Sequence, residues 1–247
     1  MKVDFGFLKK FFVVLFILLG VLAVSKLDEL QFSFDFSQFF PEEDPDLAFY
    51  DKYVEEFGTD DNFLLIAVKN PTDVFQEDFL KKFQAISKES KDFEFVLESS
   101  SITSLSYPLK TSFGYTTLPI IHIKDPNLYE QDWDKIKSDS LFINTLIAKD
   151  RKSMVLALQT EDNLNYQQSK QLLNQIRASL KANNLPNYHI LGRAFFYEAI
   201  VEMQKSEVLT TTIVASILVF IILLLVYRSM PVVLISVFSI AMSLLLF

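Results

Sequence analysis

The chain has 247 residues, a formal net charge of −8 at pH 7, no cysteine and 25 phenylalanines. This acidity argues against a nucleic-acid partner, because binding to a phosphate backbone requires a basic face. Without cysteine the chain can form no disulfide and supplies no thiol nucleophile. Two apolar ends flank an acidic middle of about 180 residues, which is long enough for a core of its own.

The N-terminal apolar stretch, residues 11–25, carries no charge. It is short for a membrane span and long for the core of a signal peptide. A cleaved signal peptide is therefore an alternative, with Ala23-Val24-Ser25 as the cleavage site. We favour an uncleaved span, because more apolar residues precede Lys9 and Lys10, which can snorkel to the interface. We assign residues 1–25 to a cytoplasmic end and a first transmembrane helix.

Residues 35–46, which follow this span, are rich in Asp and Glu. Calcium loops need regularly spaced oxygen ligands around a glycine turn, and this segment lacks that spacing, so we interpret it as a solvated charge run. The next apolar residues recur at helical spacing: Leu47, Tyr50, Val54 and Phe57. Gly58 is typical of the position that ends a helix.

A first strand–helix–strand block begins with NFLLIAVKN at residues 62–70, which predicts a strand ended by an Asn-Pro turn. Asp73 is a candidate N-cap for the helix that follows. The apolar stripe of that helix has four members: Phe75, Phe79, Phe83 and Ile86. The run FEFVLES at residues 93–99 predicts the returning strand.

The second block covers residues 141–192. LFINTLIAKDRKSMVLALQT predicts two strands around a turn at residues 149–152, and NYHILG predicts a closing strand. Residues 165–183 predict a helix with four inward side chains: Leu172, Leu173, Ile176 and Leu180. Two such blocks predict a split βαβ, ferredoxin-like sandwich. Residues 107–140, with their own predicted strand LPIIHI, are then an insertion.

Side chains that could carry out chemistry are few. His122 and His189 lie far apart in the sequence without companion ligands, which favours surface or core histidines over metal ligands. The five glycines form no phosphate-binding loop, and no Gly-x-Ser-x-Gly motif occurs. We therefore predict no catalytic, cofactor-binding or metal residue and expect a protein that is not an enzyme. Substrate-binding residues stay unassigned.

Near the C-terminus, Arg228 separates two stretches without charge, residues 208–227 and 229–247. Each has about 20 residues, or roughly 30 Å as a helix, which matches the hydrocarbon core of a bilayer. An arginine at mid-membrane costs at least about 2.5–3.5 kcal/mol on the insertion scale, whereas at an interface it costs little. One kinked core helix of a soluble protein is the alternative, but such a helix would have nothing to bury against.

Pro231 suits the first turn of a new helix, where its missing N–H would be unpaired in any case. We therefore predict a second transmembrane helix over residues 207–227, a turn over residues 228–230 and a third helix over residues 231–247. The apolar end without flanking charges predicts that the chain is truncated within this third helix.

Basic residues set the orientation. Lys2, Lys9 and Lys10 flank the first predicted span, and Arg228 lies between the other two. All four lie on the cytoplasmic side if the chain starts there, in agreement with the positive-inside rule. Residues 26–206 then form a domain outside the cytoplasm. We expect a multi-pass protein of the inner membrane with a large periplasmic domain, in which Arg228 and Pro231 serve topology.

Five motifs follow one another along the chain: FFPEEDPDLAFYDKYVEEFGTDDNFLLIAVKN, VLESSSITSLS, LIAKDRKSMVLALQTED, YHILGRAFFYEAIVEMQKSEV and LLLVYRSM. In this order they resemble the N-terminal part of RND superfamily exporters, particularly the MMPL-type branch. The last motif is similar to the aromatic-Arg-Ser turn of that family, with Tyr227 in place of the usual Phe. Arg193 is a second departure, because a smaller residue is common there.

The resemblance implies an α+β membrane protein whose transmembrane helices flank an extracytoplasmic, ferredoxin-like porter-type domain. The implied function is proton-driven export of hydrophobic or amphiphilic molecules, with lipids as one candidate class and with the outer domain handling substrate. The implied partners are membrane lipids, the substrate, and the remaining transporter helices or other protomers. No cofactor is implied.

Such pumps need ionisable residues within the membrane for proton coupling. The second and third predicted spans contain no proton-relay residue, so we do not expect this chain alone to transport. A non-transporting lipid-sensing or assembly subunit with the same architecture is an alternative function. A membrane-anchored enzyme is a further alternative, which would need clustered titratable groups in one cleft.

Overall fold

The computed structural model describes residues 14, 18, 21, 25, 41, 44–59, 61–112 and 114–246. The chain divides into two compact units, Ser33–Val201 and a second unit made of Met1–Phe32 and Glu202–Phe247. The predicted first transmembrane helix falls almost entirely outside the described residues.

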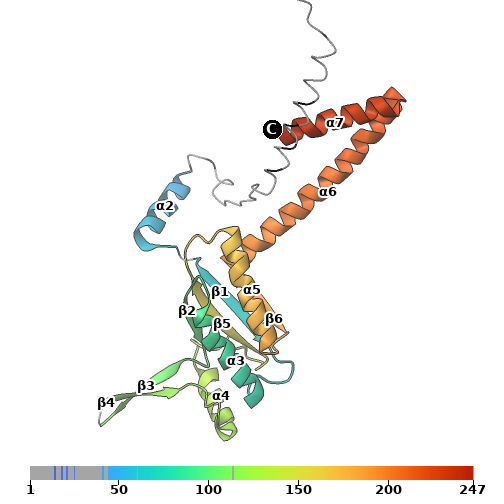
Figure 1. Ribbon diagram of the computed structural model, residues 1–247. Helices are drawn as coiled ribbons and strands as arrows, with labels where there is room; N and C mark the ends of the chain where they lie inside the picture. The colour runs from blue at the N-terminus through green and yellow to red at the C-terminus, as the bar shows by residue number, and fades with distance from the viewer. Residues whose placement is uncertain are drawn as a thin grey trace, which may run out of the picture. The chain divides into compact units, whose positions relative to one another are not determined.

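A four-stranded sheet forms the centre of the unit Ser33–Val201, in the order β2-β5-β1-β6 (Figure 1). Its strands are β1 (Phe63–Lys69), β2 (Val96–Ser101), β5 (Ser153–Thr160) and β6 (Tyr188–Gly192). All neighbouring strands are antiparallel. With helices α3 and α5, the strands form the units β1–α3–β2 and β5–α5–β6, and each unit has its two strands separated by one strand of the other.

The core lies between one face of this sheet and the helices α3 (Glu77–Glu89) and α5 (Tyr166–Ala182). Alternate strand residues point into it and are buried: Leu64, Ile66, Val68, Met154, Leu156 and Leu158. Phe75, which was predicted as part of the stripe of α3, is buried but lies before this helix. The other members of the two predicted helix stripes are buried as well: Phe79, Phe83, Ile86, Leu172, Leu173, Ile176 and Leu180. Apolar residues repeat every second position in the strands and about every 3.6 positions in the helices, and both sets pack into one core, as the two sequence blocks predict.

The predicted helix over residues 165–183 is confirmed as α5. A capping box begins it, in which Asn165 Oδ1 accepts from Gln168 N at 3.0 Å and Asn165 N donates to Gln168 Oε1 at 2.9 Å. The predicted N-cap Asp73 is wrong for α3, because α3 starts later, after Gln76. The chain before it is held in a turn, since Val74 N donates to Arg151 O at 2.8 Å.

Three strand predictions are wrong in part. FEFVLES becomes strand only from Val96, because Phe95 has a positive φ of 67° and Val96 N closes a turn onto Phe93 O. LFINTLIA forms turns and reaches β5 through one bridge, Ile147 to Met154, because Asn144 also has a positive φ and the backbone bonds locally.

The third wrong strand is LPIIHI. The strand β4 (Gly114–Pro119) contains only its first two residues, Leu118 and Pro119, and pairs with β3 (Ser106–Thr111) in a hairpin. Ile120, Ile121 and Ile123 are all buried, which the alternation of a strand would not allow. After this hairpin, the predicted insertion contains the short helix η4 (Pro126–Leu128) and α4 (Tyr129–Ser138).

The predicted helix ending at Gly58 is α2 (Pro45–Phe57). Its N-cap Asp44 accepts from Asp46 N at 2.9 Å, and Gly58, with φ 82°, closes the other end onto Val54 O. Its apolar stripe does not join the core, and Phe57 is 69% exposed.

Two apolar helices end the chain, α6 (Arg193–Tyr227) and α7 (Met230–Leu246). Among the residues that the structure describes, α6 is the one helix long and apolar enough to cross a membrane by length and composition. α7 is a shorter apolar helix. The two are separated at Arg228, whose φ is 49°, so this region is not one kinked helix.

At Gly192 the strand β6 approaches β1 so closely that a larger residue should destabilise the fold. A Cβ at this position would lie 2.1 Å from Phe63 O, and φ is 144°. We expect Gly192→Ala to lower the free energy of unfolding by at least about 2 kcal/mol, measured by denaturation of the full chain in detergent. Gly114→Ala is the control, because its φ is 129° but no described heavy atom lies within 4 Å of the added Cβ. Equal losses for both variants would contradict the close-packing argument.

Candidate functional site

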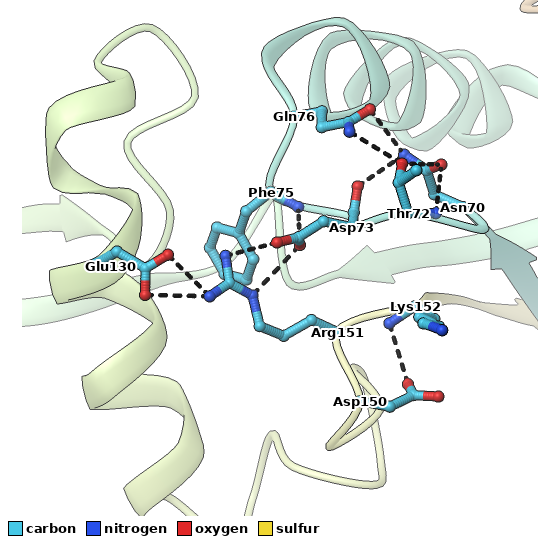
Figure 2. Close-up of polar contacts among 9 residues, drawn as sticks. All are labelled: Asn70, Thr72, Asp73, Phe75, Gln76, Glu130, Asp150, Arg151 and Lys152. Atoms are coloured by element: carbon cyan, nitrogen blue, oxygen red, sulfur yellow. Dashed lines mark hydrogen bonds and ion pairs between the residues drawn. The ribbon is translucent and has the colours of Figure 1, made fainter.

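Arg151 joins three segments of the unit Ser33–Val201 (Figure 2). It lies on the turn before β5, with φ 58°. Its Nη2 lies 2.8 Å from Asp73 Oδ2, and its Nη1 donates to Glu130 Oε1 at 2.8 Å and Oε2 at 3.1 Å. One guanidinium thus holds the loop before α3 and the helix α4 together.

Aromatic rings complete the surroundings of this guanidinium. Arg151 Cζ lies 4.9 Å from the centre of the Phe75 ring and 5.4 Å from that of Trp133. The Phe75 and Trp133 rings meet edge to face, with centroids 5.9 Å apart. Because the Arg151 side chain is only 20% exposed, both cation–π contacts are partly shielded from water. The insertion is therefore fastened to the sheet at α4.

A second group of polar contacts lies within the insertion. Asp132 is buried, accepts from His122 N at 2.8 Å and lies 2.9 Å from His122 Nδ1. Tyr129 donates its hydroxyl hydrogen to Ile123 O at 2.8 Å. Burial, with a smaller effect of Glu77, Asp125 and Asp132, raises the pKa of Tyr129. The sequence alone did not predict the pairing of His122 with Asp132. Within the described residues, no group of three or more His, Cys, Asp or Glu could hold a metal.

The first turns of α6 are fixed to the sheet by two ion pairs. Arg177 on α5 binds Glu198 on α6 through Nη1 to Oε1 at 2.9 Å and Nη2 to Oε2 at 2.6 Å. The hydrogen bond to Glu198 raises the pKa of Arg177 and outweighs the lowering by burial. Arg193 Nη1 donates to Asp61 Oδ1 at 2.9 Å and Oδ2 at 3.1 Å. The beginning of α6 is therefore part of the sheet unit, and the same helix becomes apolar further along.

A hollow lies where β1 ends and β5 and β6 begin. Its lining includes three basic side chains, Lys69, Lys152 and His189. Lys69 and Lys152 have no ion-pair partner within the part of the chain that the structure describes. This hollow could not be predicted from the sequence, because its basic residues come from three separate segments. The one signal in the sequence is a basic residue, Lys69, at the end of a predicted strand.

The sequence-predicted topology residues lie at the break between α6 and α7. Arg228 is exposed, and its N–H donates to Leu224 O at 2.9 Å. Pro231 is the second residue of α7. The positive φ of Arg228 ends α6, and the proline can start α7 without loss of a helical hydrogen bond.

A comparison with protein families relates these features to known proteins. The model of the MMPL family matches residues 79–246, which is more than half of the chain. The matched range includes most of α3, the whole insertion with α4, and both apolar helices α6 and α7. No curated protein matches the chain.

The variant Arg151→Gln tests the contacts that hold the insertion to the sheet unit at α4. The change removes both ion pairs and both cation–π contacts, so we expect a loss of about 1–2 kcal/mol in the free energy of unfolding. We also expect a red shift in the emission of Trp133, the single tryptophan of the chain. Arg193→Gln is the matched control and should leave the Trp133 emission unchanged. An unshifted spectrum in Arg151→Gln would contradict the assigned contacts.

Proposed function

The chain belongs to the MMPL family, and from this we propose that it is the N-terminal part of a proton-driven, RND-type exporter of hydrophobic or amphiphilic molecules, lipids among them. The observation that carries the proposal is the family match over residues 79–246. It extends from the sheet unit through both apolar helices, which are the regions that the proposal assigns to an outer part and a membrane part of such a transporter.

We propose that the sheet unit is a ferredoxin-like, porter-type domain that handles substrate. The strand order β2-β5-β1-β6 supports this, with antiparallel neighbours and two interleaved strand–helix–strand units. Its position outside the cytoplasm, in a protein of the inner membrane, follows from the basic residues at the first span and at Arg228.

The chain is a membrane protein by its family, and the surface of α6 supports a direct contact with lipid. Large apolar side chains around this helix are exposed, among them Ile213, Leu218 and Leu225. A helix that is apolar all round is stable when lipid or protein covers it. We propose that α6 and α7 are two spans of a multi-pass protein, joined on the cytoplasmic side at Arg228 and Pro231.

Proton coupling in this proposal belongs to other helices of the transporter. Residues 208–227 and 229–247 contain no Asp, Glu, Lys, Arg or His. Intramembrane proton relays need such groups. The remaining transporter helices or other protomers therefore supply the relay. The same lack of ionisable residues favours the second candidate function, a non-transporting lipid-sensing or assembly subunit.

Dye retention in cells tests the export function. Deletion of the gene is expected to raise the retention of the lipophilic dye Nile red, because an exporter that removes it is lost. A proton uncoupler should raise retention in the parent cells to the same level. Equal retention with and without the gene would contradict the exporter and favour the second candidate function. The purified chain alone, in vesicles under a proton gradient, is expected to export no dye; export would contradict a relay outside this chain.

Cysteine labelling tests the topology, and the cysteine-free chain gives no background. Ser229→Cys places a thiol beside Arg228, and Ser112→Cys places one in the turn between β3 and β4. In spheroplasts an impermeant maleimide should label the Ser112→Cys variant only, because position 229 faces the cytoplasm. Labelling of Ser229→Cys from outside intact spheroplasts would overturn the orientation.

A further inference from the structure

Among the residues that the structure describes, no core helix covers one face of the four-stranded sheet. α3 and α5 both lie on the other face, where they bury Leu64, Ile66 and Val68 (Figure 1). The intervening strand residues point away from them: Leu65, Ala67, Val155, Ala157 and Leu191. Among the described residues, none of these five belongs to the hydrophobic core or packs against it. We call this set the open face.

The five side chains of the open face form one continuous patch. Leu65 lies opposite Ala157 on one side and Leu191 on the other, and Ala67 lies opposite Val155. Leu191 is 65% exposed, and the other four side chains are half-buried. Antiparallel sheets with one wet face normally alternate apolar residues inward with polar residues outward. Here the centre of the outward face is apolar too, which marks a binding surface.

One end of the open face is basic. Lys69 continues the outward row of β1, and His189 lies opposite Ala67 in that same layer. Both residues and Lys152 line the hollow described above. Figure 2 shows the Arg151 side chain pointing from the turn toward Glu130, while Lys152 points away from it. Asp150, which also lines the hollow, accepts from Lys152 N at 3.0 Å and so stabilises its own turn.

The other end of the open face has the opposite character. Phe63 starts the outward row of β1 and lies opposite Gln159, which in turn lies opposite Glu98 on β2. The distance from Phe63 to Lys69 along the strand is about 20 Å. An anionic group would be attracted to the end with Lys69 and repelled from the end with Glu98. The face therefore has an apolar centre and one preferred end for a negative charge.

We propose that the open face and the hollow together bind one anionic amphiphile, such as an alkyl phosphate. Its head group lies in the hollow at Lys69, Lys152 and His189, and its hydrocarbon chain lies along Ala67 and Leu65. This inference rests on the proposed function, since it names the substrate class that the outer domain takes. The occupant follows from charge complementarity: unpaired cations at one end of an apolar strip match a molecule with one anionic end.

Environment-sensitive labelling tests the site in the full chain, held in nanodiscs of phosphatidylcholine. Bimane is attached to the variant Ala67→Cys on the open face, or to the control Ala85→Cys on the exposed side of α3. Dodecyl phosphate is the probe, with dodecyltrimethylammonium and inorganic phosphate as comparison compounds. We expect a saturable blue shift with dodecyl phosphate at position 67 only, and no shift with the other two compounds.

The head-group residues are tested by charge removal in the labelled Ala67→Cys chain. Lys69→Gln with Lys152→Gln is expected to weaken the apparent affinity for dodecyl phosphate at least about tenfold. The control pair Lys88→Gln with Lys91→Gln removes the same charge from the α3 side and should change the affinity less than about twofold.

Four results would overturn the inference. The first is an equal shift at positions 67 and 85, and the second is an affinity that Lys69→Gln with Lys152→Gln leaves unchanged. The third is competition by inorganic phosphate as strong as that of dodecyl phosphate, which would indicate a site for free anions. The fourth is a shift that grows with protein concentration without the probe, which would assign the open face to a second copy. Because this assay measures binding without transport, its failure is distinct from a negative dye-retention result.

Discussion

Leu64, Ile66 and Val68 are completely buried because β1 lies between β5 and β6 and faces both core helices. A shift of β1 by one residue would turn all three side chains to the opposite face, so the burial of this one strand sets the register of its neighbours. That register determines which residues meet at the strand ends. The hollow, the turn that carries Arg151 and the start of α6 all lie at those ends.

The start of α6 links the sheet to the apolar part of the chain. β6 ends at Gly192, where only a residue without Cβ allows the close approach to Phe63 O, and α6 begins at the next residue. Arg177 and Glu198 then hold the first turns through two parallel charge-assisted hydrogen bonds, which are stronger than neutral ones. In the proposed exporter, one helix is thus held in the substrate-handling domain and also enters the membrane.

The helices α3 and α5 bury one face of the sheet, so in the proposed arrangement the open face is available for binding. Arg151 and the rings of Phe75 and Trp133 hold α4 of the insertion beside the loop before α3. The apolar centre and the single basic end of the open face are consistent with the MMPL family's hydrophobic substrates. In the proposed arrangement, the charge of the amphiphile determines its direction along the strands, while its hydrocarbon chain provides most of the contact area.

Local periodicity was enough to predict both core helices, the strands β1 and β6, and the end of α6 at Arg228, because each depends on a repeat or a break within a few neighbouring residues. The strands LFINTLIA and LPIIHI were predicted wrongly in part. Local backbone hydrogen bonds around Asn144, which has a positive φ, replace the first strand, and Ile120, Ile121 and Ile123 are all buried in the core. The contacts of Arg151 with Glu130, of Arg177 with Glu198 and of Lys69 with the hollow join residues that are remote in the sequence. By itself the sequence determined most of the helices and core strands and the family. Only the tertiary structure decided which charges pair, which remain unpaired, and which face of the sheet stays open, because these depend on residues that are remote in the sequence.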